Sequence, residues 1–202
     1  MPARPAAQNP PSPRKSQRTR GRVLDAAARL FAKSGYAHTN LSDVAAAAGM
    51  KAGSLYYHFD SKEALVEEVL RYGTTHSFEH VKAEVERLGP TARPAAQLRA
   101  AIRAHLDSLH TLGDYASAGL RIVDQAPDAI RKRQYAIHRR YGDYWHGLLE
   151  RAQSAGLIAE NLDLLVVRLL LFGAMNGSVD WPASARRSTK DVTTALLALM
   201  GV

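Results

Sequence analysis

The spacing of apolar residues constrains this chain more than any other feature of its sequence. Nearly every apolar run repeats with the period of an α-helix, and no convincing run of alternating β-branched residues predicts a strand. Over residues 16–34, for example, Val23, Ala27 and Phe31 form one stripe, and Gly35 follows as a helix stop. We therefore expect an all-α fold.

Glycine and proline divide the remaining sequence into further helical segments. We expect Asn40, with Asp43 as its partner, to cap the second helix, and Asp60 or Ser61 to cap the fourth. The sequence contains no internal repeat. In all it predicts about nine helices, which we place at residues 16–34, 41–48, 53–59, 62–88, 95–112, 115–123, 127–155, 162–179 and 189–200.

The composition excludes several functional classes. The 202 residues include no cysteine, which excludes disulfide scaffolds, Cys-ligated zinc, iron–sulfur clusters and thiol catalysis. No run of apolar residues approaches the length that a membrane-spanning helix needs. Residues 1–15 contain five prolines and no apolar run, which argues against a secretory signal. We expect a cytoplasmic protein with no cofactor and no membrane partner.

Positive charge is concentrated at the start of the chain. The net charge is +8, and six basic residues precede the first acidic one, Asp25. Prolines and polar residues in this region bury nothing, so we expect residues 1–15 to form a disordered basic arm. Such an arm either binds a polyanion or serves only as a solubilising tail, and the charge alone does not distinguish the two.

Residues 40–59 read NLSDVAAAAGMKAGSLYYHF, and their sizes fit a helix-turn-helix. Two helices that cross steeply over a short turn need small residues at the crossing and a glycine in the turn. Ala45 and Ala48 meet the first requirement, and Gly49 meets the second. The second helix then has a defined inner face, because Leu55 is the first of two apolar residues one turn apart on it.

The outer face of that second helix carries two adjacent tyrosines, Tyr56 and Tyr57. Since Leu55 and Phe59 fill the inner face, neighbouring side chains are free to meet base edges and phosphates in a major groove. The alternative for one of the tyrosines is packing against the following helix. Lys62 lies in the first turn of that helix, where the helix dipole makes a positive charge unfavourable. A contact with a DNA phosphate would explain a lysine at this position.

Because of these residues and their order, the sequence resembles the TetR family of bacterial transcription regulators over about residues 18–70. Two positions depart from the family pattern: Lys51 stands where the family commonly has a Ser cap, and Ala52 where it often has Lys or Gln. The residues that follow the pattern, in order and without gaps, are Leu30, Phe31, Gly35, Tyr36, Thr39, Val44, Ala45, Ala48, Gly49, residues 53–59 and residues 62–65.

The resemblance implies a regulator and not an enzyme. It implies a helix-turn-helix domain over residues 16–62 and a helical effector-binding and dimerisation domain over residues 63–202. The homodimer would act as a repressor whose affinity for a palindromic double-stranded DNA operator falls when a small molecule binds. The residues it assigns to DNA binding are Arg18, Arg20, Thr39, Ser42, Lys51, Ala52, Gly53, Ser54, Tyr56, Tyr57, His58 and Lys62.

The last two predicted helices are strongly apolar. Residues 169–172 are apolar nearly all round, so their helix must be covered on more than one side. In relatives, these two helices pack against their symmetry mates. We therefore expect a dimer interface formed by Leu165, Leu169, Phe172, Gly173, Gly177, Leu196 and Leu197.

Residues 175–182 loosely resemble a pattern in TetR relatives that include regulators responding to acyl-CoA thioesters. The effector would then be an acyl-CoA thioester or another apolar metabolite. The basic residues of the segment 131–140 could meet the phosphates of such a ligand, or they form a solvated helix face. The candidates for the effector pocket are Leu106, Leu109, Tyr141, Trp145, Met175 and Asn176. Packing in the core would explain the apolar residues among them equally well.

Two other functions compete with this reading. His76, Glu79 and His80 match the spacing H-x-x-E-H, which on a helix could serve a zinc-dependent enzyme or a metal sensor. No third ligand is identifiable, so we expect no metal site. The basic arm alone would also suit a non-specific architectural DNA-binding protein, but the tyrosine pair and the shaped turn argue against it.

Overall fold

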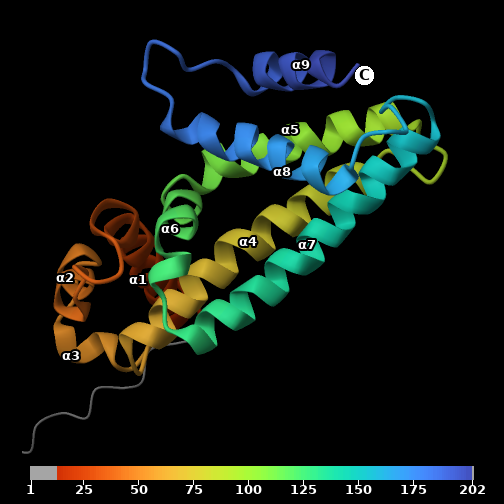
Figure 1. Cartoon of the computed structure of the whole chain (residues 1–202). Helices are drawn as coiled ribbons and strands as arrows, with labels where there is room; N and C mark the ends of the chain where they lie inside the picture. The colour runs from red at the N-terminus through yellow and green to blue at the C-terminus, as the bar shows by residue number, and fades with distance from the viewer. Residues whose placement is uncertain (1–12, 202) are drawn as a thin grey trace, which may run out of the picture.

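The computed structural model describes residues 13–201, and the regular secondary structure in this range is all helical, with no strand (Figure 1). It confirms the predicted all-α fold and the expected helix number. Its elements are α1 (Pro13–Ser34), α2 (Leu41–Ala47), α3 (Ala52–Leu55), α4 (Lys62–Glu86), α5 (Pro94–Leu112), α6 (Asp114–Ile122), η1 (Val123–Gln125), α7 (Asp128–Ser154), α8 (Leu164–Gly177), η2 (Ser178–Asp180) and α9 (Thr189–Leu199).

Helix α1 begins at Pro13, three residues before the predicted start. Proline is favoured in the first turn of a helix, where its missing N–H is not needed. Residues 13–15 of the expected arm are therefore helical, and the rest of the arm lies outside the described residues.

Helices α1, α2 and α3 form a small head at one end of the molecule (Figure 1). The head shares one apolar core with neighbouring elements. Phe31 of α1 and Leu55 of α3 belong to the same buried cluster as Val66 of α4 and Ile122 of α6. The head is therefore packed directly on α6.

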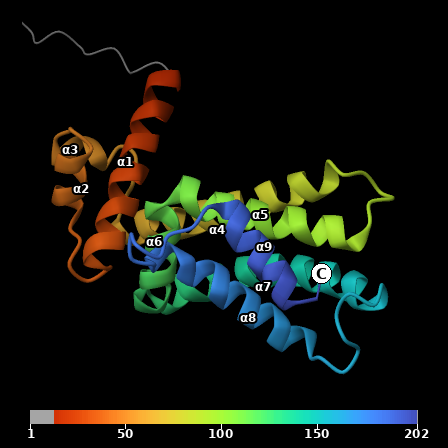
Figure 2. The ribbon, with the colours of Figure 1, turned by 90° about the horizontal axis from the view of Figure 1, so that it is seen from above.

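The remaining helices form an elongated body in which α4 and α7 run side by side and α5, α8 and α9 pack beyond them (Figures 1 and 2). A second apolar cluster fills this body around Trp145 of α7, with Leu106 of α5, Leu171 and Met175 of α8 and Leu197 of α9. Since α4 contributes to both clusters, it connects the head to the body.

The helix-turn-helix forms as its residue sizes predict. Ala45 and Ala48 are buried at the crossing, and Gly49 takes a φ of +67° in the turn. Ser61 caps α4 by accepting a hydrogen bond from the Ala64 N–H at 3.0 Å. The expected cap at Asn40 is wrong in one respect, because its side chain makes no capping hydrogen bond and only its backbone carbonyl accepts one, from Val44.

Helix α3 is shorter than predicted. It ends at Leu55, and the chain continues as a turn in which the His58 N–H donates to the Leu55 carbonyl at 2.8 Å. Lys51 occupies the N-cap position and its side chain makes no capping bond. The helix thus lacks a side-chain cap at its start.

Candidate functional site

The tyrosine pair of the head faces outward. Tyr56 is 54% exposed and Tyr57 is 90% exposed, while Leu55 before them and Phe59 after them are buried. Lys51, like its neighbours 52 and 53, is also exposed, and Ser54 and His58 are half-buried. Ser42 of α2 and Arg18 of α1 are exposed as well. Apart from the three described next, the residues predicted to bind DNA are therefore exposed or half-buried.

Thr39, Arg20 and Lys62 do not present free polar groups on this surface. Thr39 is 2% exposed, and its hydroxyl donates to the Gly35 carbonyl at 2.8 Å, so it closes the turn after α1. The Lys62 ammonium lies 4.2 Å from the centroid of the Tyr36 ring. That cation–π contact gives Lys62 a partner inside the protein.

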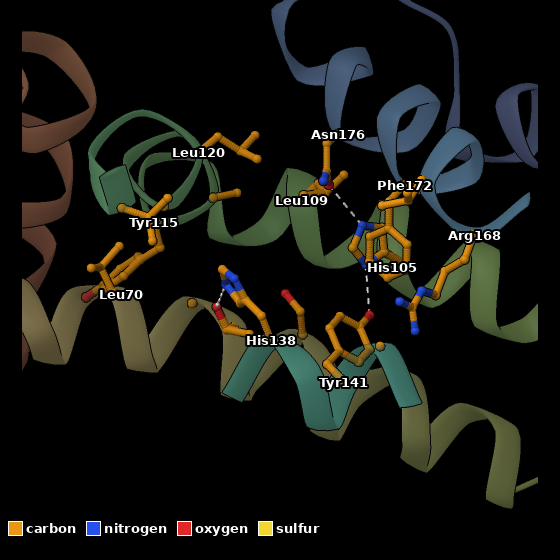
Figure 3. Close-up of a pocket in the computed structure, with 18 residues that line it drawn as sticks. Leu70, His105, Leu109, Tyr115, Leu120, His138, Tyr141, Arg168, Phe172 and Asn176 are labelled. Atoms are coloured by element: carbon orange, nitrogen blue, oxygen red, sulfur yellow. Dashed lines mark hydrogen bonds between the residues drawn. The ribbon is translucent and has the colours of Figure 1, made fainter. Parts of the chain in front are cut away.

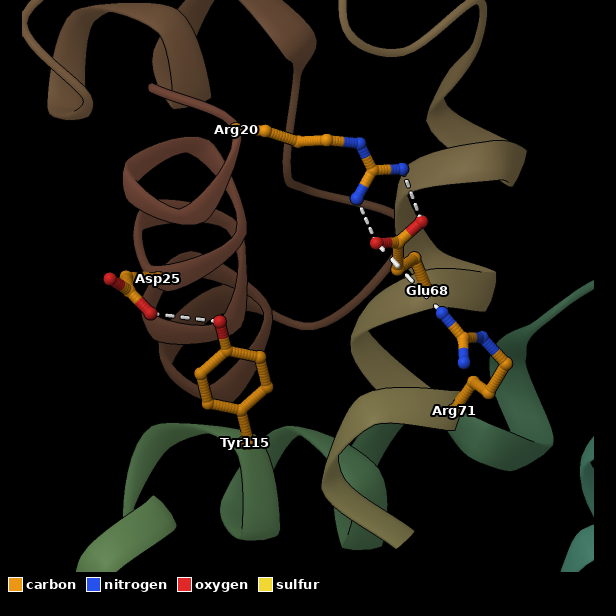
Figure 4. Close-up of polar contacts among 5 residues, drawn as sticks. All are labelled: Arg20, Asp25, Glu68, Arg71 and Tyr115. Atoms are coloured by element: carbon orange, nitrogen blue, oxygen red, sulfur yellow. Dashed lines mark hydrogen bonds and ion pairs between the residues drawn. The ribbon is translucent and has the colours of Figure 1, made fainter. Parts of the chain in front are cut away.

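Arg20 is held by helix α4. Both of its terminal nitrogens donate to the carboxylate of Glu68, and its guanidinium lies 4.4 Å from the centroid of the Phe59 ring. The bonds from Arg20 lower the pKa of Glu68 below its usual range. Arg71 approaches the same carboxylate at 4.0 Å (Figure 4). Arg20 therefore joins α1 to α4, a role the sequence analysis missed because the partner lies 48 residues away.

A second contact joins the head to α6. The Tyr115 hydroxyl donates to Asp25 Oδ1 of α1 at 2.8 Å (Figure 4). Burial, followed by this hydrogen bond, raises the pKa of Tyr115, so its hydroxyl stays protonated and able to donate. The Tyr36 N–H also donates to Gln125 Oε1 of η1, at 3.0 Å.

The body contains a cavity of about 350 Å³ between α4, α5, α6, α7 and α8 (Figure 3). Its walls are mainly apolar, with Leu109 from α5, Leu120 from α6 and Phe172 from α8. Tyr115 also lines it, so the residue that bonds the head forms part of the cavity wall. A cavity of this size and polarity is typical of a small-molecule site.

Three polar side chains in the cavity wall are joined by hydrogen bonds. His105 is buried, and its ring nitrogens lie 2.8 Å from the Tyr141 hydroxyl and 3.1 Å from Asn176 Oδ1 (Figure 3). Burial lowers the pKa of His105 to about 4, so the ring is neutral at pH 7. Because the Asn176 oxygen can only accept, Nε2 carries the proton, and Nδ1 accepts from Tyr141.

His138, one turn before Tyr141 in α7, belongs to a second polar group on the cavity wall. Its Nε2 lies 3.2 Å from the Thr74 hydroxyl and 3.1 Å from Gln134 Nε2. Its ring opens onto the cavity, yet the surrounding protein lowers its pKa by desolvation. The two hydrogens of Gln134 Nε2 are directed at the Leu70 carbonyl and the Thr74 hydroxyl, so at neutral pH His138 Nε2 accepts from the Thr74 hydroxyl and Nδ1 carries the proton.

Three of the six predicted pocket residues line this cavity: Leu109, Tyr141 and Asn176. The other three, Leu106, Trp145 and Met175, are fully buried in the body core and do not reach it. Sequence reasoning missed His105, His138 and Arg168. A signal existed for His105, because it interrupts the apolar pattern of α5 between Ala104 and Leu106.

The residues predicted for the dimer interface divide between two faces. Leu165, Leu169, Gly173 and Gly177 are exposed on α8. Phe172 is different, since it packs edge-on against His105 and lines the cavity, and Leu169 also borders it. In α9, Leu197 is buried within the body, and Leu196 is half-buried.

The basic segment of α7 is only partly available to a ligand. Arg131 bonds Asp128, and Arg133 bonds Glu67 through two nitrogens. Lys132, Arg139 and Arg140 are exposed. Arg131 is therefore paired within α7, and Arg133 joins α7 to α4.

The H-x-x-E-H segment gains no support as a metal site. Within residues 13–201, no three His, Cys, Asp or Glu side chains are placed to hold a metal ion. His76 instead stacks on Tyr72, with 5.8 Å between the ring centroids.

Within the described residues 13–201, no helix is long and apolar enough to cross a membrane.

Comparison with known proteins decides the family. The pattern described as "Bacterial regulatory proteins, tetR family" matches residues 23–69, and "Tetracyclin repressor-like, C-terminal domain" matches residues 91–200. This chain belongs to the TetR family. It is a DNA-binding transcriptional regulator, as its helix-turn-helix predicted, and its matched relatives are regulators rather than enzymes.

Individual relatives agree with this assignment. The chain is 37% identical over 166 residues to the HTH-type transcriptional repressor KstR2 of Mycobacterium tuberculosis, covering 80% of each protein. A solved structure of KstR2 from that organism superposes with a TM-score of 0.77 at 25% identity, over 90% of this chain and 92% of that one. AibR, in complex with isovaleryl coenzyme A and operator DNA, superposes with a TM-score of 0.74 at 25% identity, over 90% and 97% of the two chains.

The buried His105 makes the stability of this TetR-family protein depend on pH. Its pKa is about 4 in the folded protein against 6.5 as the ordinary value, so the unfolded state binds more protons between these values. Its contribution to stability is complete above pH 6.5 and falls as the pH drops towards 4. From about pH 7.5 to about pH 5, we expect this histidine to cost about 2 kcal/mol of unfolding free energy.

Urea denaturation at the two pH values measures this effect. His105→Gln, which keeps one hydrogen-bonding side chain there without a titrating ring, should lose about 2 kcal/mol less than the parent. Equal losses in the two proteins would show that His105 is not the group responsible.

Proposed function

We propose that this chain is a homodimeric repressor that leaves its operator when a small apolar metabolite fills the cavity of the body. The observation that carries the proposal is the position of Tyr115. This residue lines the cavity and hydrogen-bonds Asp25 in the first helix of the DNA-binding head. A ligand that displaces Tyr115 therefore acts on the head through a direct contact.

Relatives support both halves of the proposal. KstR2 is named a transcriptional repressor, and the AibR structure holds isovaleryl coenzyme A and operator DNA. An acyl-CoA thioester or another apolar metabolite would suit the mainly apolar cavity of this chain. A regulator that binds DNA directly would work in the cytoplasm.

DNA contact would come from the exposed surface around α3. Tyr56 and Tyr57 are placed to reach base edges or thymine methyl groups, and Lys51 and Arg18 to reach phosphates. The short α3 would bring Ser54 and His58 to the same groove. A two-fold symmetric pair of heads requires half-sites about 34–36 Å apart, so the operator should be palindromic.

Dimerisation would use the exposed apolar face of α8. Leu169 is 61% exposed and Leu170 is 69% exposed, and Leu165 and Val166 continue the face. Gly173 has open space around it and would allow a partner helix to approach closely. An apolar surface of this kind marks an interface, and a second copy is the occupant that would hold two heads at a fixed distance.

The repressor would respond by a shift between two states. A ligand that fits best when α6 and α4 have moved around the cavity favours a head position that no longer matches successive major grooves. The fall in operator affinity is then set by the difference in ligand affinity between the two states, commonly about 5- to 150-fold. The Tyr115 and Arg20 contacts are the links that would carry this difference.

The DNA-binding surface is tested by Tyr56→Ala. We expect about 10-fold or greater loss of affinity for an operator selected from random duplexes, with unchanged thermal unfolding, because Tyr56 is exposed and its loss leaves no cavity. Lys51→Ala should weaken binding to all duplexes and reduce the slope of log affinity against log salt concentration by about one. Tyr135→Ala, an exposed tyrosine of α7, is the control and should bind like the parent.

The dimer is tested by Leu170→Glu. Placing a carboxylate from each subunit in an apolar interface should raise the dimer dissociation constant by about 100-fold or more. Sedimentation velocity measures this constant, and operator affinity should fall with it. Leu88→Glu, at an exposed leucine after α4, should stay dimeric. A parent protein that sediments as a monomer at micromolar concentration would contradict the proposed interface.

The link from cavity to head is tested by Tyr115→Phe. This variant keeps the ring and removes only the hydrogen bond to Asp25. With isovaleryl-CoA as the first probe, the ligand-induced fall in operator affinity should shrink by about 3- to 10-fold, the value of one hydrogen bond. Tyr72→Phe is the matched control, because its ring packs at a tilt against the Tyr115 ring, with 4.9 Å between the centroids, and its hydroxyl has no hydrogen bond to α1 in the described structure. An undiminished response in Tyr115→Phe would remove this residue from the pathway.

A further inference from the structure

The cavity of the body has one charged residue in its wall, and the charge is positive. Its described lining contains no Asp or Glu, and Arg168 of α8 is its single Lys or Arg. The two lining histidines, His105 and His138, add no charge at neutral pH, because burial lowers the pKa of His105 and desolvation by the surrounding protein lowers the pKa of the more exposed His138. The described lining of the cavity therefore has a net charge of +1.

Gly142 of α7 allows Arg168 to reach this position. A Cβ atom at residue 142 would lie 2.9 Å from Arg168 Nη1 and 3.2 Å from its Cζ. Any side chain larger than hydrogen would have to displace the guanidinium. Figure 3 shows Arg168 extending from α8 towards α7, next to Phe172 and Tyr141.

Arg168 has no protein partner for its charge. It makes no ion pair and no side-chain hydrogen bond within the described residues. Arg20, Arg131 and Arg133, by contrast, are each paired with a carboxylate. A half-buried guanidinium beside apolar walls, with none of its hydrogen-bond donors used by the protein, is free to bind an anion that enters the cavity.

We propose that Arg168 binds an acidic group of the effector, so that the ligand is an apolar molecule with one anionic end at the edge between α7 and α8. This inference rests on the proposed function, because it takes the cavity as the effector site. A guanidinium binds carboxylate and phosphate oxygens with two parallel hydrogen bonds. The anionic group is therefore the carboxylate of a free acid or a phosphate of a coenzyme A thioester.

The size of the cavity limits the apolar part. At about 350 Å³ it lies near the lower end of the range for ligand sites, about 300–1,000 Å³. An acyl chain fits this space, but the nucleotide of coenzyme A would lie outside. Leu109, Leu120 and Phe172 would contact the chain.

Isothermal titration calorimetry with three compounds that share one chain tests the proposal: octanoate, 1-octanol and octanoyl-CoA. We expect at least one of the two anions to bind the parent protein about 10- to 100-fold more tightly than 1-octanol, the range for hydrogen bonds to a charged group. Arg168→Gln should abolish that advantage and leave 1-octanol binding nearly unchanged. Arg99→Gln, at an exposed arginine of α5 outside the cavity, should bind all three compounds like the parent.

The two sources of the anion give different results. Loss of octanoate affinity in Arg168→Gln identifies a carboxylate ligand, and loss confined to octanoyl-CoA identifies a phosphate. Equal binding of octanol and both anions, unaltered affinities in Arg168→Gln, or no binding of either anion would overturn the role of Arg168. The repressor function fails separately, namely if no ligand that binds the cavity alters operator affinity in a gel-shift assay.

Discussion

The packing of α1 on α6 is the constraint on which the rest of this structure depends. The head does not enclose an apolar core by itself, since Phe31 and Leu55 are buried in a cluster completed by Ile122 of α6 and Ile130 of α7. Burial of this surface is the main favourable term holding the head in place. The position of the recognition surface is therefore fixed by a helix that also forms a wall of the cavity.

Polar contacts give this junction its orientation. Apolar packing is non-directional, whereas the bonds from Tyr115 to Asp25 and from Arg20 to Glu68 each fix one helix against another. Arg20 meets α4 and Asp25 meets α6, so a change in either body helix reaches α1 by a separate contact. In the proposed mechanism, a ligand would thus alter the head without unfolding any helix.

Local sequence patterns predicted those parts of the structure that depend on neighbours in the chain. Helix positions, the small residues of the crossing and the outward-facing Tyr56 and Tyr57 all follow from spacing over a few residues. The contacts that the sequence analysis missed are those of single side chains. Arg20 bonds a residue 48 positions away, a pairing that neither residue type nor spacing indicates, and Thr39 bonds a backbone carbonyl, which every residue carries. The same holds for Arg168, whose place on the cavity wall depends on Gly142 of another helix.

Helix α8 has two functional faces with different neighbours. Phe172, Asn176 and Arg168 face the cavity, while Leu165, Val166 and Leu170 face away from the body. In a two-fold dimer built on that outer face, the helix that lines each cavity would also contact the partner subunit. Occupying the first cavity would then alter the wall of the second, and titrations of the dimer would follow a Hill coefficient different from one.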